Sequence, residues 1–447
     1  MAKKSNIVRK KKSTINLLVI FILVIGWICT IFTLLDNSEE EEQLAYVQTA
    51  QELLADKLYV RAIKNYLSAI NDYETEHNTR LEKELETVYF QAGMLDEYYE
   101  LIEDRISAET ADSDEYYTLA QKYIEEERNA QAIAVLQKGI ARFEENGDLI
   151  QLQETVRYEY RPRTINLSQV IQPSENWLIP AFDGSKWGYM DADGDTAIDF
   201  IYEEATRFAG NYAVVKLDGV YTLIDQSGYW NAVDKNGLEA VTDISDSAIV
   251  AVKNGKTQIY SRTFQLLSEE TFDTVYLNDN GLVVAQKEGK WAILSESLEP
   301  ITEYIYTDVV VNSMDDVFFG DFAMVKDEQG YVLVNPEGKP MYEKRFVNAK
   351  GYEGGLIAVA NEEGKWGYAN GYGEQIIDYQ YMDAQSFSCG LGAIKFAGKW
   401  GYINRYNTRI IEVQYKEAYP FVAGSTLAKT ELGNHEILIM KHYELFE

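Results

Sequence analysis

Few residues of this chain have the type and spacing that chemistry requires. Asp191, Asp193 and Asp195 surround Gly194 as oxygen ligands do in a calcium loop. The twelfth position of such a loop needs a glutamate that binds through both carboxylate oxygens, but this chain has Tyr202 there. We therefore expect a plain hairpin turn and no metal site at these residues.

Common signatures of catalysis and cofactor binding are also missing from the sequence. The three histidines, His77, His435 and His442, have no nucleophile at a telling spacing. The Gly390–Gly392 segment lacks the third glycine and the strand–helix context of a nucleotide-binding fingerprint. Acidic residues are abundant, so a hydrolase with paired carboxylates stays open. We predict a protein without cofactors that is not an enzyme.

The charge distribution excludes one class of partner. The chain has 447 residues, 46% of them hydrophobic, and a net charge of −31. Residues 1–35 carry six positive charges and no acid, so the rest of the chain carries a net charge of −37. A body this acidic repels phosphate backbones, and we expect no nucleic-acid binding.

An uncharged, mostly apolar segment covers residues 13–35. Its length is enough to cross a bilayer as a helix. Basic residues precede it in 1–12 and acidic residues follow it, which by the positive-inside rule puts the N-terminus in the cytoplasm. The sequence predicts a transmembrane signal anchor and a single-pass cell-membrane protein with extracytoplasmic C-terminal domains. A cleaved signal peptide is the alternative, although its apolar region is normally shorter.

Residues 36–160 have the apolar period of helices. Ala50 and Ala120 are 70 positions apart, as are Ala62 and Ala132, which is about twice the period of a helix–turn–helix repeat. The order of small and large positions resembles the tetratricopeptide repeat, which implies either a groove for a protein partner or a packed spacer. The acidic residues of this region are expected to form a solvated face: Glu82, Glu84, Glu86, Glu97, Glu100, Glu103, Asp104, Glu125, Glu126 and Glu127.

A short linker is expected over residues 161–173, because Pro162 and Pro173 interrupt any helix. Beyond it, one motif recurs with an aromatic slot about every 35 residues, at spacings of 34 to 40. The eight slots are Trp187, Tyr221, Thr257, Trp291, Tyr331, Trp366, Trp400 and Glu436. Thr257 and Glu436 are not aromatic and are recognised mainly by their spacing. A glycine follows three of the tryptophans, at Gly188, Gly367 and Gly401. We take the signature residues to be structural: Trp187, Gly188, Tyr221, Trp291, Tyr331, Trp366, Gly367, Trp400 and Gly401.

Each unit also contains a glycine turn and, in several copies, a Tyr-x-x-Ala-x-x-Phe element such as Tyr202–Phe208. Short strands separated by turn residues indicate an all-β repeat. Residues 174–447 resemble the bacterial WG-repeat family, named for Trp-Gly, over nearly their whole length. The fold class predicted for the chain is α+β multidomain: a transmembrane helix, α-helical hairpin repeats, then an all-β repeat domain.

The β-repeat domain could close into a β-propeller or stay an open β-solenoid. Closure is favoured because Trp177–Phe182 looks like the end of one unit, and Glu436–Leu445 looks like the start of another. The two fragments would complete one blade and close the ring with seven internal units.

The recurring aromatic residues could stack on carbohydrate, but a fixed position in every copy is typical of core packing. A binding surface is more expected on loops that differ between copies, such as residues 312–316 or 350–354. We predict a membrane-anchored scaffold that binds a protein at the bacterial cell envelope through its helical repeats or β-repeat loops. A protein that binds or hydrolyses cell-wall glycan is the alternative, and the sensing ectodomain of a signalling assembly is a third possibility.

Overall fold

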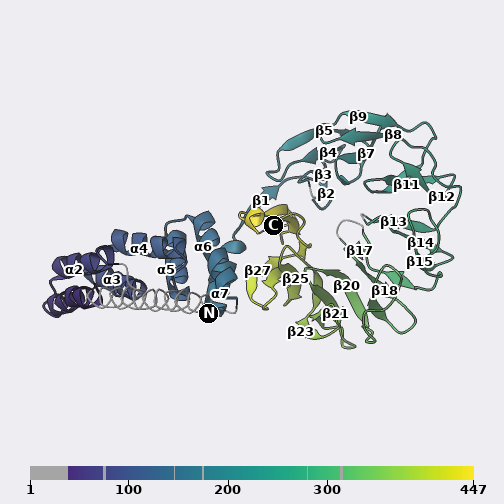
Figure 1. The fold of residues 1–447 in the computed structure, drawn as a ribbon. Helices are drawn as coiled ribbons and strands as arrows, with labels where there is room; N and C mark the ends of the chain where they lie inside the picture. Colours follow the sequence, from purple (N-terminus) through teal and green to yellow (C-terminus); the bar gives the residue numbers. More distant parts are fainter. Residues whose placement is uncertain are drawn as a thin grey trace, which may run out of the picture. The chain divides into compact units, whose positions relative to one another are not determined.

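The structure is a computed structural model that describes residues 39–73, 77–144, 146–173, 176–278, 280–312 and 316–446. The chain divides into two compact units that meet between Val156 and Arg157. The first unit is helical and the second is built of strands (Figure 1).

Between residues 59 and 142, successive helices of the first unit pack against each other in chain order. Residues 39–55 are helical, and the following helices are α2 (Tyr59–Asn71), α3 (Asn78–Ala92), α4 (Leu95–Ser107), α5 (Ser113–Glu125), α6 (Asn129–Arg142) and α7 (Gly147–Arg157). Ala62 and Ala132 are fully buried, because a small side chain lets neighbouring helices approach closely. The predicted helices are present, and the resemblance to the tetratricopeptide repeat stays a prediction.

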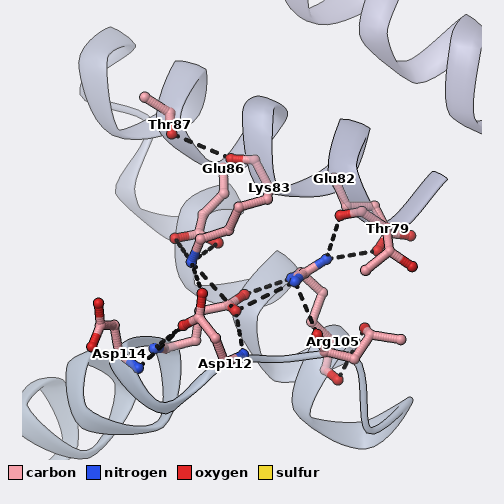
Figure 2. A network of polar contacts seen from close by, with 10 residues as sticks. Thr79, Glu82, Lys83, Glu86, Thr87, Arg105, Asp112 and Asp114 are labelled. Atoms are coloured by element: carbon pink, nitrogen blue, oxygen red, sulfur yellow. Dashed lines mark hydrogen bonds and ion pairs between the residues drawn. The ribbon is translucent and has the colours of Figure 1, made fainter. Parts of the chain in front are cut away.

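A buried network of charged residues ties α3, α4 and α5 together (Figure 2). The Arg105 guanidinium contacts Glu82 of α3 at 3.0 Å and Glu115 of α5 at 2.5 Å. Lys83 contacts both Glu86 and Glu115. The expectation that the acids of this region form a solvated face is therefore wrong for Glu86, which is 7% exposed.

The prediction of a membrane-spanning helix is corrected by the structure. Among the residues described, none of the helices has the length and apolar character needed to cross a membrane. The single-pass topology and the membrane localisation derived from that helix are therefore withdrawn. The predicted segments 1–12 and 13–35 themselves lie outside the described residues.

The described residues of the second unit form eight antiparallel sheets, here called blades 1 to 8. Blades 1 to 4 consist of β2 (Gln169–Val170), β3 (Ile179–Phe182), β4 (Trp187–Met190) and β5 (Thr196–Tyr202); β6 (Glu204–Ala205), β7 (Tyr212–Leu217), β8 (Val220–Asp225) and β9 (Trp230–Val233); β10 (Ala240–Ile244), β11 (Ala248–Lys253) and β12 (Lys256–Ser261); and β13 (Thr274–Leu277), β14 (Val283–Lys287) and β15 (Lys290–Leu294).

Blades 5 to 8 continue the series. They consist of β16 (Asp308–Val309), β17 (Phe318–Phe319), β18 (Phe322–Lys326) and β19 (Tyr331–Val334); β20 (Asn348–Glu353), β21 (Leu356–Ala360), β22 (Trp366–Asn370) and β23 (Gln375–Tyr381); β24 (Asp383–Ser388), β25 (Leu391–Phe396), β26 (Lys399–Asn404) and β27 (Arg409–Tyr415); and β28 (Glu417–Ala418), β29 (Ser425–Lys429), β30 (His435–Met440) and β1 (Tyr160–Ile165). A short 3-10 helix, Tyr443–Leu445, follows β30.

The blades follow one another around a ring, with their first strands towards its centre (Figure 1). Each blade packs between two neighbouring blades, so the inner strands of a blade are buried on both faces. All five residues of β21 are buried in this way. One apolar cluster joins Ile165, Leu427 and Ile439 of blade 8 to Ile179 and Met190 of blade 1. This contact closes the ring, so the β-propeller prediction is confirmed and the open solenoid is excluded.

Ring closure uses a different strand from the one expected. Ile179–Phe182 is the second strand of blade 1, whereas β1 pairs along its length with β30 and completes blade 8. The segment 161–173, expected as a linker, therefore contains most of β1 and all of β2. Pro162 is compatible with β1 because this strand is the edge of its sheet, where a missing N–H is tolerated.

Candidate binding site

The signature aromatic residues lie in the third strand of their blades and point into the core. Trp291 and Trp366 are 7% exposed, Trp400 is 6% exposed, and the related Tyr221 and Tyr331 are also buried. Trp187 is half-buried against Phe182. These rings fill space within the propeller, so their placement argues against open platforms for stacking on a ligand.

The glycine after the tryptophan lies where two strands approach closely. A Cβ at Gly401 would lie 2.5 Å from the carbonyl oxygen of Ile411, and one at Gly188 would lie 2.8 Å from that of Ile198. Gly367 is in the same situation beside Ile377. In each case the third strand pairs with the fourth through a register shift. Glycine is required there because any side chain would collide with the fourth strand.

The tyrosine two positions after each of these tryptophans connects its blade to the next. Tyr189, Tyr368 and Tyr402 are fully buried, and each ring packs edge-on against a phenylalanine of the following blade. The hydroxyl donates a hydrogen bond to a backbone carbonyl 17 residues later, at Thr206, Gln385 and Tyr419. The phenylalanines are those of the Tyr-x-x-Ala-x-x-Phe element: Phe208, Phe387 and Phe421. Both recurring motifs are thus parts of one contact between blades.

The aspartates that resembled a calcium loop form the turn between β4 and β5. The backbone N–H of Asp195 donates to the Asp191 carboxylate at 2.9 Å. Asp193 and Asp195 form ion pairs with Arg161 and Arg163 of β1. Within the described chain, no group of three or more metal-ligating side chains is close enough to hold an ion.

The connections between the first and second strands of the blades form one face of the ring, here called the tip face. Neighbouring blades are hydrogen-bonded to each other along it. The side-chain amide oxygen of Asn278 accepts from the backbone N–H groups of Val317 and Phe318, at 2.8 and 2.9 Å. The Asn280 amide donates to Gly320 at 3.2 Å. These bonds hold β17 and the turn between β17 and β18 of blade 5 against blade 4.

A pocket of about 360 Å³ opens on the tip face and is here called the rim pocket. Blade 4 contributes Asn280, blade 6 contributes Tyr352 and Glu353, and blade 5 contributes Asn312, Asp316, Phe318 and Phe319. Its volume lies at the lower end of the roughly 300–1,000 Å³ typical of ligand pockets. Both loops that the sequence indicated, residues 312–316 and 350–354, supply lining residues.

The repeat that contributes most of the described lining residues of the rim pocket carries an insertion. Tyr306 and Phe318 are 12 positions apart, whereas their counterparts, Tyr381 at the end of blade 6 and Phe387 in the first strand of blade 7, are 6 apart. The extra residues precede β17 and bring Asp316 and Phe319 to the pocket. The 40-residue spacing between the Trp291 and Tyr331 slots carries this signal in the sequence, but the phenylalanines themselves were not expected.

The rim pocket has acidic and aromatic walls. Asp316 is 6% exposed, and its backbone N–H donates to the Asn312 side chain at 2.9 Å. Burial raises the pKa of Glu353 to about 7, although a hydrogen bond with Ser388 works to lower it. The described lining residues include two carboxylates and no lysine, arginine or histidine. The described lining residues of the pocket therefore carry a net negative charge.

Comparison with curated proteins and with solved structures gives only weak similarities. No curated protein matches the chain significantly. Similar solved structures include Hsv2 from Kluyveromyces lactis, at 8% identity, with 60% of this chain and 96% of that chain covered and a TM-score of 0.33. A eukaryotic initiation factor is 10% identical, with 60% of this chain and 83% of that chain covered and a TM-score of 0.39. YCF48 bound to D1 peptide is 11% identical, with 63% of this chain and 96% of that chain covered and a TM-score of 0.31. These values are too low to support an inference about this chain.

The repeats themselves give a specific match. Residues 187–221, 366–400 and 400–434 match the sequence model of the WG containing repeat. Each of the three segments starts at a tryptophan that is followed by one of the close-approach glycines. The chain is therefore a protein with WG repeats, which here form blades of a propeller.

Proposed function

We propose that this chain is a non-enzymatic binding protein whose propeller holds a protein partner at the tip face. The observation that carries this proposal is the rim pocket, which is built by the one repeat that is clearly longer than the others. Loops on a rigid ring can vary without disturbing the packing between blades, and binding residues are concentrated on such loops. A pocket at the variable position supports binding there.

The repeated residues support the proposal indirectly. Trp291, Trp366 and Trp400 are buried between strands, so the hypothesis that they stack on glycan loses its basis. The residues available to a partner are instead those in which the blades differ. Phe319 and Tyr352 are half-buried in the rim pocket and combine an apolar surface with nearby polar groups, as the centres of protein interfaces often do.

Site-specific photo-crosslinking tests the proposal on the full chain. A photoreactive phenylalanine analogue replaces Phe319 or Tyr352 in cells that express the protein, and crosslinked proteins are identified by mass spectrometry. Tyr372 is the matched control, because it lies in the same blade, is 76% exposed and belongs to the turn between β22 and β23. Val60, also 76% exposed, samples the helical unit.

Binding of the purified partner then decides the result. We expect Phe319→Ala and Tyr352→Ala to weaken binding by at least about tenfold, as loss of an interface anchor does. Tyr372→Ala should leave the affinity unchanged, and thermal melts check that each variant is folded. A partner captured only from Val60 would move the site to the helical unit. Equal binding by all variants would overturn the proposal.

One observation favours a second function, the hydrolysis of a glycan. The rim pocket places Asp316 and Glu353 in one cavity, and Glu353 has a pKa near neutrality. Glycoside hydrolases use two carboxyl groups, one of which has a raised pKa and acts as the acid. Incubation with soluble polysaccharides and an assay for new reducing ends tests it. Turnover that both Glu353→Gln and Asp316→Asn abolish would favour the hydrolase over the binding protein.

A further inference from the structure

The rim pocket carries a carboxylate without a cation. Among the described residues, no lysine, arginine or histidine forms an ion pair with Glu353. The basic residue of the same strand, Lys350, lies over the Trp366 ring at 5.4 Å from its centroid. Burial of an ionised carboxylate costs free energy unless a cation or enough hydrogen bonds offset it. Glu353 shows this cost as its raised pKa.

Aromatic rings lie beside this carboxylate. Phe319 and Tyr352 line the same pocket, and the Tyr352 ring is held edge-on by Phe322 at a centroid distance of 5.7 Å. The Phe319 ring lies directly against Gly351, where a Cβ would overlap it. The glycine therefore lets the ring occupy this position. Aromatic faces attract cations, and they also pack well against the methylene groups of long basic side chains.

We propose that the rim pocket binds a lysine or arginine side chain of the protein partner, with Glu353 as its counter-ion and Phe319 and Tyr352 against its stem. This inference rests on the proposed function and names the chemistry of the partner. Asp316 lines the same pocket and adds a second carboxylate to the surroundings of an ammonium or guanidinium group. A neutral or acidic side chain would leave the Glu353 carboxylate without a cation beside it.

A selection with peptides tests the inference on the full-length protein. A random linear peptide library displayed on phage is selected on the wild-type chain and, separately, on the Glu353→Gln variant. Glu363→Gln is the matched control, because it removes the same charge from an exposed residue in the turn between β21 and β22. Selected peptides are then synthesised, and their affinity is measured by calorimetry at several pH values.

We expect the wild-type pool to share one lysine or arginine. Its replacement by norleucine or citrulline, or the Glu353→Gln substitution, should weaken binding at least about tenfold, because each removes one partner of a desolvated charge pair. Glu363→Gln should have no effect. The affinity should also fall by roughly five- to tenfold from about pH 8 to about pH 6 as Glu353 becomes protonated. This dependence should be absent in Glu353→Gln.

The possible failures are distinguishable. Peptides that need Tyr352 but contain no required basic residue, or bind Glu353→Gln equally well, would overturn the inference and leave the proposed function intact. Peptides that are insensitive to Tyr352→Ala, Phe319→Ala and Glu353→Gln would overturn both. Thermal melts of each variant separate lost binding from lost folding.

Discussion

The guanidinium of Arg105 lies 2.5 Å from the carboxylate of Glu115, and both side chains are almost fully buried, at 4% and 1% exposed. Arg105 also donates to the backbone carbonyls of Thr79 and Thr110. Glu115 in turn completes a capping box with Asp112 at the start of α5. One cation thus joins three consecutive helices, and each of its partners depends on it (Figure 2).

Replacement of Arg105 by leucine should therefore be severely destabilising. The change removes the nearest cation from the buried Glu115 carboxylate and leaves Lys83, at 3.3 Å, beside it. Loss of one partner of a buried charge pair typically costs about 3–5 kcal/mol. Urea unfolding followed by far-UV circular dichroism measures the loss through the helical signal. Arg80→Ala is the control, because Arg80 is 62% exposed and pairs with Glu84 at 3.7 Å. It should change stability by no more than about 0.5 kcal/mol. Equal effects of the two substitutions would contradict the prediction.

Glu86 makes the same network sensitive to pH. Burial raises the pKa of Glu86, and the neighbouring Glu115 adds to the effect against the opposing Lys83. Burial acts on Glu115 too, but the hydrogen bonds from Arg105 and the Asp112 backbone outweigh it and lower the pKa of Glu115. The two carboxyl groups therefore ionise far apart in pH, as acids that share one proton do.

The sign of the stability change follows from the raised pKa. Between the unfolded value of 4.5 and the higher folded pKa of Glu86, the folded state binds more protons than the unfolded state. The contribution of Glu86 is therefore fully present below 4.5 and is lost as the pH rises through the folded pKa. We expect Glu86→Gln to raise the melting temperature at about pH 8 and to change it little at about pH 5. A larger gain at the acidic pH would contradict this assignment.

The sequence allowed prediction of features that recur and missed features that occur once. The eight slots, six of them aromatic, each fall in a strand of a different blade, because the order of strands repeats in every copy. Burial of Glu86 was not predictable, since its surroundings in the sequence are as acidic as the exposed parts of the helices. The charge that stabilises its neighbour Glu115 comes from Arg105, on another helix.

The rim pocket shows the same limit. Its loops were predicted because they differ between copies, but which loops meet could not be predicted. Asn280, Phe319 and Glu353 are brought together by the packing of three consecutive blades. Likewise, β1 pairs with residues about 270 positions away, and the local signal from Pro162 suggested a linker. Pairing over such distances depends on the topology and leaves little trace in local composition.

Gly401→Ala should destabilise the propeller by about 1–3 kcal/mol, because the added methyl group collides with the Ile411 carbonyl and an overpacked site must shift. Ala292→Gly is the matched control. Ala292 occupies the same position in blade 4, where the described residues form only three strands. It should cost only about 0.5–1 kcal/mol, as glycine does in a strand. Six of the seven tryptophans lie beyond residue 157, so their fluorescence during urea unfolding reports on this unit. A neutral Gly401→Ala would show that the fourth strand is not held close.

The last prediction concerns closure of the ring by β1. A chain that starts at Arg157 keeps all of β1 and should unfold in one cooperative transition, because the propeller is a compact unit from that residue onward. A chain that starts at Leu167 loses the pairing with β30 and the burial of Ile165, which is 6% exposed. Burial of one such side chain alone is worth roughly 1.5–3 kcal/mol. The exposed pairs of Arg161 and Arg163 with the β4–β5 turn add little.

We therefore expect the shorter chain to unfold at a lower urea concentration and to exchange the amide hydrogens of β30 faster than those of β14. Blade 4 lies away from the closing point, so β14 serves as the internal control. A double substitution, Arg161→Ala with Arg163→Ala, keeps the strand and should leave both measurements nearly unchanged. If the two truncated chains were equally stable, the pairing of β1 with β30 would not be what holds the ring closed.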